Sequence, residues 1–256
     1  MSNEVIKKDT GSVALFGDDL QKGFENMTQE DMALPFVRIL GQLSPQVTDG
    51  DAKYIDGAKP GMIYNTVTSE CFDGKKGIKV IPCYYKKDYP EWSDRGDGPG
   101  APVAVHLPNS PVIQTGKRDG SKIRLPNGNY LEETASYYVL VETKAGGMTP
   151  ALISMKSTQL NVSKKWNSMM KTIQIPDGKG GMAIPPMHGV VYNLQSVLQK
   201  NDKGSWYGWS VSQDRIMGQE DKSLYLTAKD FNSTASKGNV QTKADVEEKP
   251  KDSTPY

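Results

Sequence analysis

Residues 136–173 read SYYVLVETKAGGMTPALISMKSTQLNVSKKWNSMMKTI. Two runs in this stretch, 136–143 and 149–155, are rich in β-branched and aromatic residues and flank the glycine pair at 146–147. Such runs around a glycine turn predict a β-hairpin. Beyond the hairpin the apolar residues recur at helical spacing, so a helix is expected there. The apolar face of this helix would hold Val162, Trp166, Met169 and Ile173.

Four further segments have the composition of strands. Residues 61–68 and 77–85 form one pair around a turn, and residues 189–198 and 205–211 form another. The apolar alternation slips beside Pro82, which has no N–H to donate to a ladder. We therefore expect a β-bulge or an edge strand at this point.

Helices are also expected near both ends of the strand-forming region. The first would cover residues 33–43 and place Pro35 in its first turn. The second would be a short helix at residues 224–231. The helix of the opening stretch would be capped by Ser157 or Thr158.

The order of these elements predicts a mainly β fold with one or two helices. A small β-barrel of the oligonucleotide-binding (OB) type fits the order, and a β-sandwich fits it as well. Residues 93–132 are rich in Gly, Pro, Asn and Asp and are expected to form a long loop excursion outside the core. The chain would comprise a flexible acidic leader at 1–32, the OB-like domain at 33–232 and a disordered tail at 233–256.

Composition limits the classes of protein. The 256 residues are 36% hydrophobic, with a mean hydropathy of −0.57 and a formal net charge of +1. Residues 36–236 hold 24 basic and 19 acidic side chains, a balance that suits a nucleic-acid binder without requiring one. The chain shows neither a signal-peptide pattern nor an apolar run of membrane-spanning length. We therefore expect a cytoplasmic protein with Cys71 and Cys83 reduced.

Aromatic residues are interleaved with lysines in three segments, 84–92, 164–171 and 203–209. Bases stack on aromatic rings and phosphates pair with ammonium groups, so this combination suits single-stranded nucleic acid. Trp166 is an exception, because its helical spacing assigns it to the core. The expected nucleic-acid-binding residues are Tyr84, Tyr85, Lys86, Lys87, Tyr89, Trp92, Lys164, Lys165, Lys171, Trp206, Tyr207 and Trp209.

Catalytic sites find little support in the sequence. His106 and His188 lack the spacing of metal ligands, and no nucleotide-binding motif is present. Glu91, Asp94 and Asp97 form an acidic group that could hold Mg²⁺ in a nuclease, and a solvated loop is the other interpretation. We expect no enzymatic activity, no cofactor and no metal.

The last residues, 245–256, are slightly acidic and end in Tyr256. Some bacterial and phage single-strand-binding proteins recruit replication partners through acidic tails that end in an aromatic residue. This tail resembles that pattern, and ordinary disorder also explains it.

Four segments together resemble a family of tailed-bacteriophage proteins, some of them labelled single-stranded-DNA-binding. These segments are residues 34–45, 80–92, 137–140 and 155–167, and the resemblance covers residues 33–217. The resemblance implies a phage protein that coats single-stranded DNA without sequence preference during replication or recombination, in the host cytoplasm. It supplies no motif of binding residues. The alternatives are a phage structural or interaction protein and, third, a metal-dependent nuclease.

Overall fold

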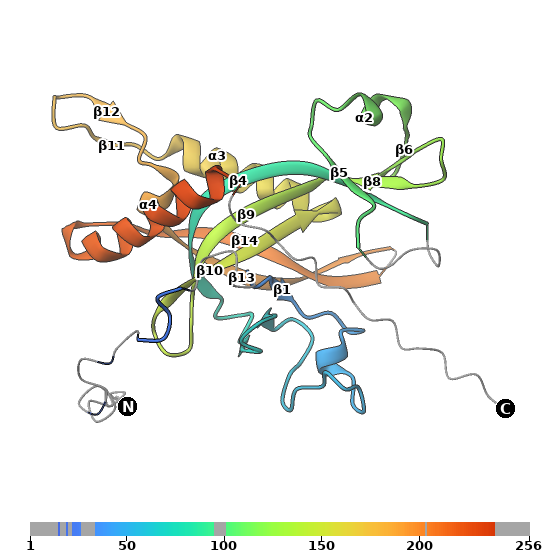
Figure 1. Cartoon of the computed structure of the whole chain (residues 1–256), viewed down its shortest axis with the longest axis horizontal. Coiled ribbons are helices and arrows are strands. Elements are labelled where there is room, and N and C mark those ends of the chain that lie inside the picture. Colours follow the sequence, from blue (N-terminus) through green and yellow to red (C-terminus); the bar gives the residue numbers. More distant parts are fainter. Residues whose placement is uncertain are drawn as a thin grey trace. The chain divides into compact units, whose positions relative to one another are not determined.

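The computed structural model describes residues 34–94, 101–202 and 204–238, together with Leu15, Asp19 and residues 22–26. The chain forms two compact units, Met1–Met32 and Ala33–Tyr256, and the elements labelled in Figure 1 belong to the second. Most of the expected leader and residues 239–256 of the expected tail lie outside the described residues. None of the helices in the described part of the chain combines the length and the apolarity that crossing a bilayer requires.

Five strands form a strongly curled antiparallel sheet. β4 (Ile78–Trp92), β9 (Thr134–Glu142) and β10 (Met148–Lys156) form a meander, and β13 (Val190–Asn201) and β14 (Gly204–Ile216) form a hairpin. β13 pairs with β4, which gives the order β10-β9-β4-β13-β14. This is the strand order of an OB fold. The prediction of a mainly β, OB-like fold is confirmed (Figure 1).

A short strand lies between the two edges of this sheet. β1 (Val37–Ile39) lies next to both β10 and β14 and pairs with β2 (Ile63–Asn65). Phe36, which precedes β1, forms a parallel bridge with Leu152 of β10, whose N–H donates to the carbonyl of Pro35 at 2.8 Å. The curled sheet is thereby extended to a half-closed barrel.

The helix expected at residues 33–43 is wrong. Among the described residues of this segment, Val37–Ile39 form strand β1, and residues 42–43 form a turn in which Leu43 is 94% exposed. A short apolar run suits either conformation, and here β2 and β10 supply the hydrogen-bond partners of a strand. The 3-10 turn η3 (Pro45–Val47) follows, and β3 (Cys71–Phe72) pairs on the far side of β2. The expected pairing of residues 61–68 with 77–85 is wrong, because β2 pairs with β1 and β3, whereas β4 pairs with β9 and β13.

Aromatic rings fill much of the barrel interior. Tyr137 of β9 stacks on Trp166 with ring centroids 4.3 Å apart, and Trp166 meets Tyr192 of β13 edge-on at 5.6 Å. Trp166 belongs to α3 (Leu160–Thr172), which connects the meander to the hairpin and presents its predicted apolar face to this core. The predicted side-chain cap is wrong, because the 3-10 turn η4 (Ser157–Gln159) leads into the helix without a capping hydrogen bond.

A β-bulge interrupts β4 where the alternation predicted it. The register between β4 and β9 shifts between Pro82 and Tyr84, so Cys83 is the extra residue. Ile81, before the bulge, packs on the outer side of the sheet, and Tyr84, after it, packs on the same side. Tyr85 consequently points into the barrel, where its ring lies 5.1 Å from that of Tyr137.

The outer face of the meander is covered by α4 (Lys222–Ser236), which follows the 3-10 turn η6 (Gln219–Asp221). Its buried residues pack against the outward side chains of β4 and β9. They are Ala228, Phe231 and Ala235. The expected short helix therefore exists but is longer, and it continues to Ser236, past Ser233 where the tail was expected to begin.

The excursion at residues 93–132 is not a plain loop. β5 (Ala104–His106) and β8 (Tyr130–Glu132) pair with the last part of β4, and β7 (Lys122–Arg124) and β6 (Lys117–Asp119) extend this sheet from β8. With α2 (Pro111–Thr115) they surround a small core of their own. Its buried members are Tyr89, Ile123, Leu125 and Leu131. The described part of the excursion lies outside the barrel core, as expected, and forms a small core of its own to which β4 supplies Tyr89.

Three short elements lie between α3 and β13. β11 (Ile175–Pro176) and β12 (Met182–Ala183) form a small hairpin that projects from the barrel (Figure 1), and η5 (Met187–Gly189) follows. Met182 and Ile184 of this projection are exposed.

The stack around Trp166 predicts a large loss of stability on truncation. Trp166→Ala should lower the free energy of unfolding by about 3–5 kcal/mol, because it removes a fully buried ring and leaves a cavity. Urea unfolding followed by circular dichroism measures this loss. Lys165→Ala on the exposed side of the same helix is the control and should change stability by less than about 0.5 kcal/mol. Equal losses in the two variants would contradict the assigned core.

Candidate nucleic-acid interface

The aromatic and lysine side chains at the end of β4 do not share one surface. Tyr84 lies on the outer face, where its ring is 5.7 Å from that of Tyr138. Tyr85 points into the barrel core. Tyr89 is 8% exposed and packs in the core of the excursion, and Trp92 is half-buried at the strand end. Tyr89 is therefore removed from solvent, whereas Tyr84, Tyr85 and Trp92 are half-buried.

Both lysines of this run are engaged with carboxylates. Lys86 Nζ lies 3.0 Å from Asp88 Oδ2, and Lys87 Nζ lies 2.5 Å from Glu133 Oε1. The hydrogen bond to Glu133 raises the pKa of Lys87. A phosphate would have to displace these carboxylates, so the run is a weaker candidate for backbone contact than its sequence suggests.

The aromatic residues of β14 are divided between the core and a surface cleft. Trp209 is 5% exposed and packs in the barrel core. The half-buried ring of Tyr207 lies directly over Gly61, where an added Cβ would come within 2.5 Å of it. Trp206, on the other side of the strand, is also half-buried. Trp206 is thus the aromatic residue of this strand that borders open space.

A cleft with a volume of about 330 Å³ lies beside Trp206, between η4 and the turn of the β13–β14 hairpin. The indole N–H of Trp206 is buried and has no hydrogen-bond partner in the described structure. The other lining residues are Ser157, Thr158, Asn201, Gly204 and Ser205. The sequence offered no sign that Ser157 and Thr158 would meet Trp206, because these segments are distant in the chain.

Gln159 connects α3 to strand β14. Gln159, directly before α3, accepts a hydrogen bond from the backbone N–H of Trp209 at 2.8 Å, and its amide nitrogen lies over Gly208. A Cβ at Gly208 would come within 2.4 Å of that nitrogen. The helix and the aromatic strand, which were separate candidates in the sequence, are therefore neighbours in the structure.

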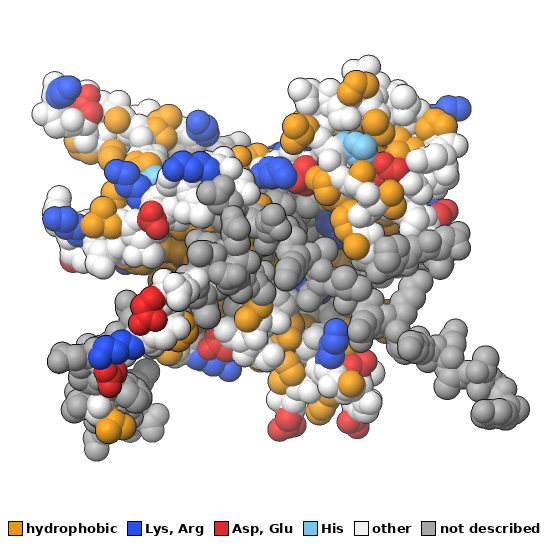
Figure 2. Space-filling view, in the orientation of Figure 1, with side chains coloured by type: hydrophobic (Ala, Val, Ile, Leu, Met, Phe, Trp, Pro, Cys, Tyr) orange, Lys and Arg blue, Asp and Glu red, His pale blue; other side chains and the backbone are white. Residues whose placement is uncertain are grey.

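The three candidate lysines of α3 are all exposed. Lys164, Lys165 and Lys171 have no ion pair among the described residues, and the helix contains no Asp or Glu. A second group of exposed lysines lies on α4 and just beyond its end, at Lys222, Lys229 and Lys237. Figure 2 shows Lys and Arg side chains, with few acidic ones, over the region of α4.

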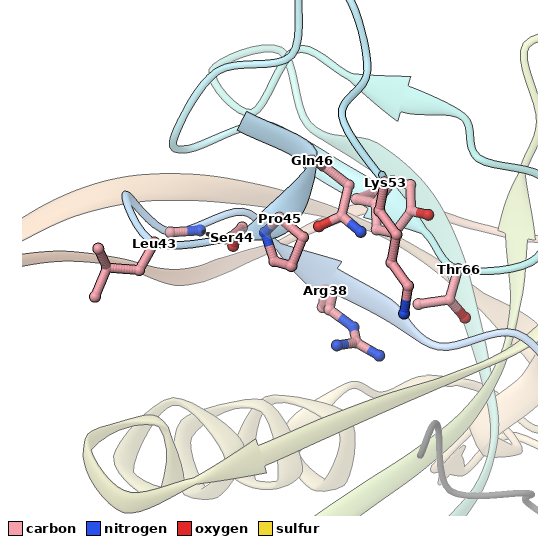
Figure 3. Close-up of a pocket in the computed structure, with 9 residues that line it drawn as sticks. Arg38, Leu43, Ser44, Pro45, Gln46, Lys53 and Thr66 are labelled. Carbon is pink, nitrogen blue, oxygen red and sulfur yellow. Dashed lines mark hydrogen bonds between the residues drawn. The ribbon is translucent and has the colours of Figure 1, made fainter. Parts of the chain in front are cut away.

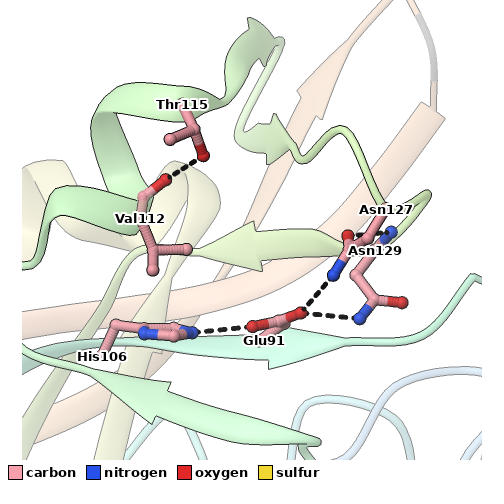
Figure 4. Close-up of polar contacts among 6 residues, drawn as sticks. All are labelled: Glu91, His106, Val112, Thr115, Asn127 and Asn129. Atoms are coloured by element: carbon pink, nitrogen blue, oxygen red, sulfur yellow. Dashed lines mark hydrogen bonds and ion pairs between the residues drawn. The ribbon is translucent and has the colours of Figure 1, made fainter.

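The two described carboxylates of the nuclease alternative, Glu91 and Asp94, have different partners. Glu91 is 7% exposed, and its carboxylate accepts hydrogen bonds from His106 Nε2 at 2.7 Å, Asn127 Nδ2 at 3.1 Å and Asn129 Nδ2 at 2.6 Å (Figure 4). The bonds from Asn129 and His106 hold the pKa of Glu91 below its usual value. Asp94 pairs with Arg124 at 3.2 Å, and Asp97 lies outside the described residues.

Glu91 therefore has a structural role in joining β4, β5 and the turn before β8. Nowhere in the described part of the chain do three His, Cys, Asp or Glu side chains gather where they could hold a metal ion.

A family model described as Pam3 phage gp34-like protein matches residues 7–241. The chain belongs to this phage protein family. Searches of the curated proteins and of the solved structures found no significant match. The expectation of a bacteriophage protein family is thereby confirmed, while the single-stranded-DNA-binding label stays a prediction.

The network around Glu91 predicts a pH-dependent contribution to stability. Glu91→Gln should lower the free energy of unfolding at neutral pH by about 1–3 kcal/mol, because the amide nitrogen of Gln would face a donor that now has a carboxylate partner. A carboxyl with a lowered folded-state pKa stabilises the protein above its unfolded-state pKa of about 4.5. This stability is lost as the pH falls through the folded-state pKa.

Urea unfolding at neutral pH and at about pH 3 measures the effect, and the difference between wild type and Glu91→Gln should shrink at the lower pH. Asp94→Asn is the control, since its partner is an exposed arginine and the expected loss is below about 1 kcal/mol. A difference that stays constant with pH would contradict the ionised network.

Proposed function

We propose that this protein binds single-stranded DNA without sequence preference, using the cleft at Trp206 and the lysine-bearing face of α3. The observation that carries the proposal is the unpaired indole of Trp206 in an open cleft on an OB-like barrel. In OB folds the loop between the last two strands is part of the usual oligonucleotide site. Here that loop is the β13–β14 turn, which lines the cleft.

The chemistry of the cleft supports a nucleic-acid ligand. A half-buried indole offers a ring face for stacking, which every base can use, and hydroxyl groups at Ser157, Thr158 and Ser205 can bond to sugar or phosphate oxygens. No carboxylate lines the cleft among the described residues, so the lining itself carries no negative charge. Exposed lysines on α3 add counterion release, which is independent of sequence.

The position of α4 narrows the possible paths for a strand. The outer face of the second and third barrel strands is the other common part of an OB site. In this chain α4 packs on the outward residues of β4 and β9. The second and third barrel strands are β9 and β10, so α4 covers β9 and the first strand, β4, and leaves part of this face uncovered. The covered part favours a path along the hairpin turn and α3.

The lysines of α3 predict a specific salt dependence. Binding of a fluorescently labelled oligo-dT should weaken with salt, and replacing Lys164, Lys165 and Lys171 by Gln should lower the slope of log K against log salt by about 2. The control replaces Lys222, Lys229 and Lys237 by Gln, which removes the same charge from the α4 region. The control should keep the wild-type slope within about 0.5.

Double-stranded DNA and Mg²⁺ complete this experiment. The absence of oligo-dT binding by the wild type at low salt would overturn the proposal. Shortening of the oligonucleotide with Mg²⁺ would favour the nuclease. If both lysine variants lowered the salt slope equally, binding would depend only on the net charge of the protein and not on the position of the lysines.

The stacking role of Trp206 gives a second prediction. Trp206→Ala should weaken oligo-dT binding by about 1–3 kcal/mol, or about 5- to 150-fold in Kd, with little change in salt slope. Fluorescence anisotropy of the labelled strand measures both quantities. Leu198→Ala is the control, because Leu198 is 61% exposed on the same hairpin and offers no ring. Similar affinities for the two variants would remove Trp206 from the interface.

A protein interface is the second candidate function, and the edge strand β5 favours it. Val103, Val105 and Leu107 alternate along this segment and are 59%, 52% and 57% exposed. Among the described strands β5 pairs only with β4, so its other edge can accept a further strand.

A further inference from the structure

A second pocket, with a volume of about 400 Å³, lies on the outer side of β1 and β2. Arg38 and Tyr64 are direct cross-strand neighbours in this ladder, and Thr66 lies two residues beyond Tyr64. Strand alternation therefore turns these three side chains away from the barrel core, which receives Val37 and Ile63. The loop between the strands forms the opposite wall with Ser44, Gln46 and Lys53.

The loop that forms this wall is held by its own hydrogen bonds. The N–H of Ile55 donates to the carbonyl of Gln46 at 3.0 Å, and the N–H of Lys53 donates to Asp51 Oδ1 at 2.8 Å. In Figure 3 the side chains of Arg38 and Lys53 approach the same side of the pocket, with Thr66 beside Lys53. Arg38 of β1 and Lys53 of the loop therefore line the same pocket.

The hydroxyl groups of the pocket are arranged to donate. Ser44 Oγ accepts a hydrogen bond from the N–H of Gly41 at 2.8 Å, and Thr66 Oγ1 accepts one from the N–H of Phe36 at 2.9 Å. Neither hydroxyl donates a hydrogen bond among the described residues, so each O–H proton can be donated to a ligand. The described residues that line the pocket include no Asp or Glu.

We propose that this pocket binds a phosphate group through Lys53 and Arg38, assisted by the hydroxyls of Ser44 and Thr66. Two cations and two hydroxyl donors match the several acceptor oxygens and the negative charge of a phosphate. In the function proposed above, on which this assignment of source rests, the phosphate belongs to the DNA backbone. A free phosphate compound has the same chemistry and is the other source.

The test compares Lys53→Gln with Lys59→Gln, which removes an equal charge from the same loop outside the pocket. In the DNA arm, Lys53→Gln should weaken oligo-dT binding about 5-fold at 0.1 M salt and lower the salt slope by about 0.7, the effect of one lost phosphate contact. In the phosphate arm, inorganic phosphate should raise the Tm of the wild type above its value in chloride of equal ionic strength. Lys53→Gln should lose this rise, and Lys59→Gln should behave as the wild type in both arms.

The two arms separate the possible outcomes. If Lys53→Gln weakens oligo-dT binding and also abolishes the phosphate-induced rise in Tm, and Lys59→Gln does neither, the pocket is a site for backbone phosphates. If Lys53→Gln abolishes only the phosphate-induced rise in Tm, the pocket binds phosphate, but DNA is not the source of that phosphate. No loss in either arm, or equal losses in the two variants, overturns the pocket. If the wild type fails to bind oligo-dT, the proposed function fails, and the phosphate arm still decides whether the pocket binds phosphate.

Discussion

Strand β4 is the constraint on which the rest of the structure depends. It has β9 on one side and β13 on the other within the barrel, and its last residues pair with β5 and β8 of the excursion. One strand therefore carries backbone hydrogen bonds for two sheets. The bulge at Cys83 lets it do so, because an extra residue shifts the alternation and increases the local twist. Without that shift Tyr84 would point into the barrel and Tyr85 away from it.

The bulge also determines what each face can offer a ligand. By turning Tyr85 inward it completes a series of rings from Tyr85 through Tyr137 and Trp166 to Tyr192. Aromatic density in this part of the sequence is thus largely a property of the core. Trp92 and Trp206 are both half-buried with an unpaired indole N–H, and Trp206 differs from Trp92 in lining the cleft.

The sequence predicted those features that depend on local pattern. The β9–β10 and β13–β14 hairpins, the bulge beside Pro82 and the apolar face of α3 follow from alternation, turn residues and helical spacing, and the core position of Trp166 follows with them. Features that depend on distant partners were missed. The carboxylates that engage Lys86 and Lys87, the core completed by Tyr89 and the pocket at Lys53 require the fold to bring segments together. The segment at 33–43 was misassigned because its hydrogen-bond partners on β2 and β10 are not visible in its own residues.

Energetic magnitudes favour a strand path along α3 over one beneath α4. Lifting α4 from the sheet would expose Phe231, at a cost of about 1.5–3 kcal/mol, and would also uncover Ile81 and Leu140, each at a comparable cost. It would further break the hydrogen bond from Asn232 to the carbonyl of Cys83. Stacking one base contributes about 1–3 kcal/mol. Several bases would therefore have to stack to offset the free-energy cost of displacing α4. The cleft at Trp206 requires no such displacement, and the exposed lysines of α3 are already unpaired among the described residues. A strand that binds there gains its contacts without first unpacking the barrel.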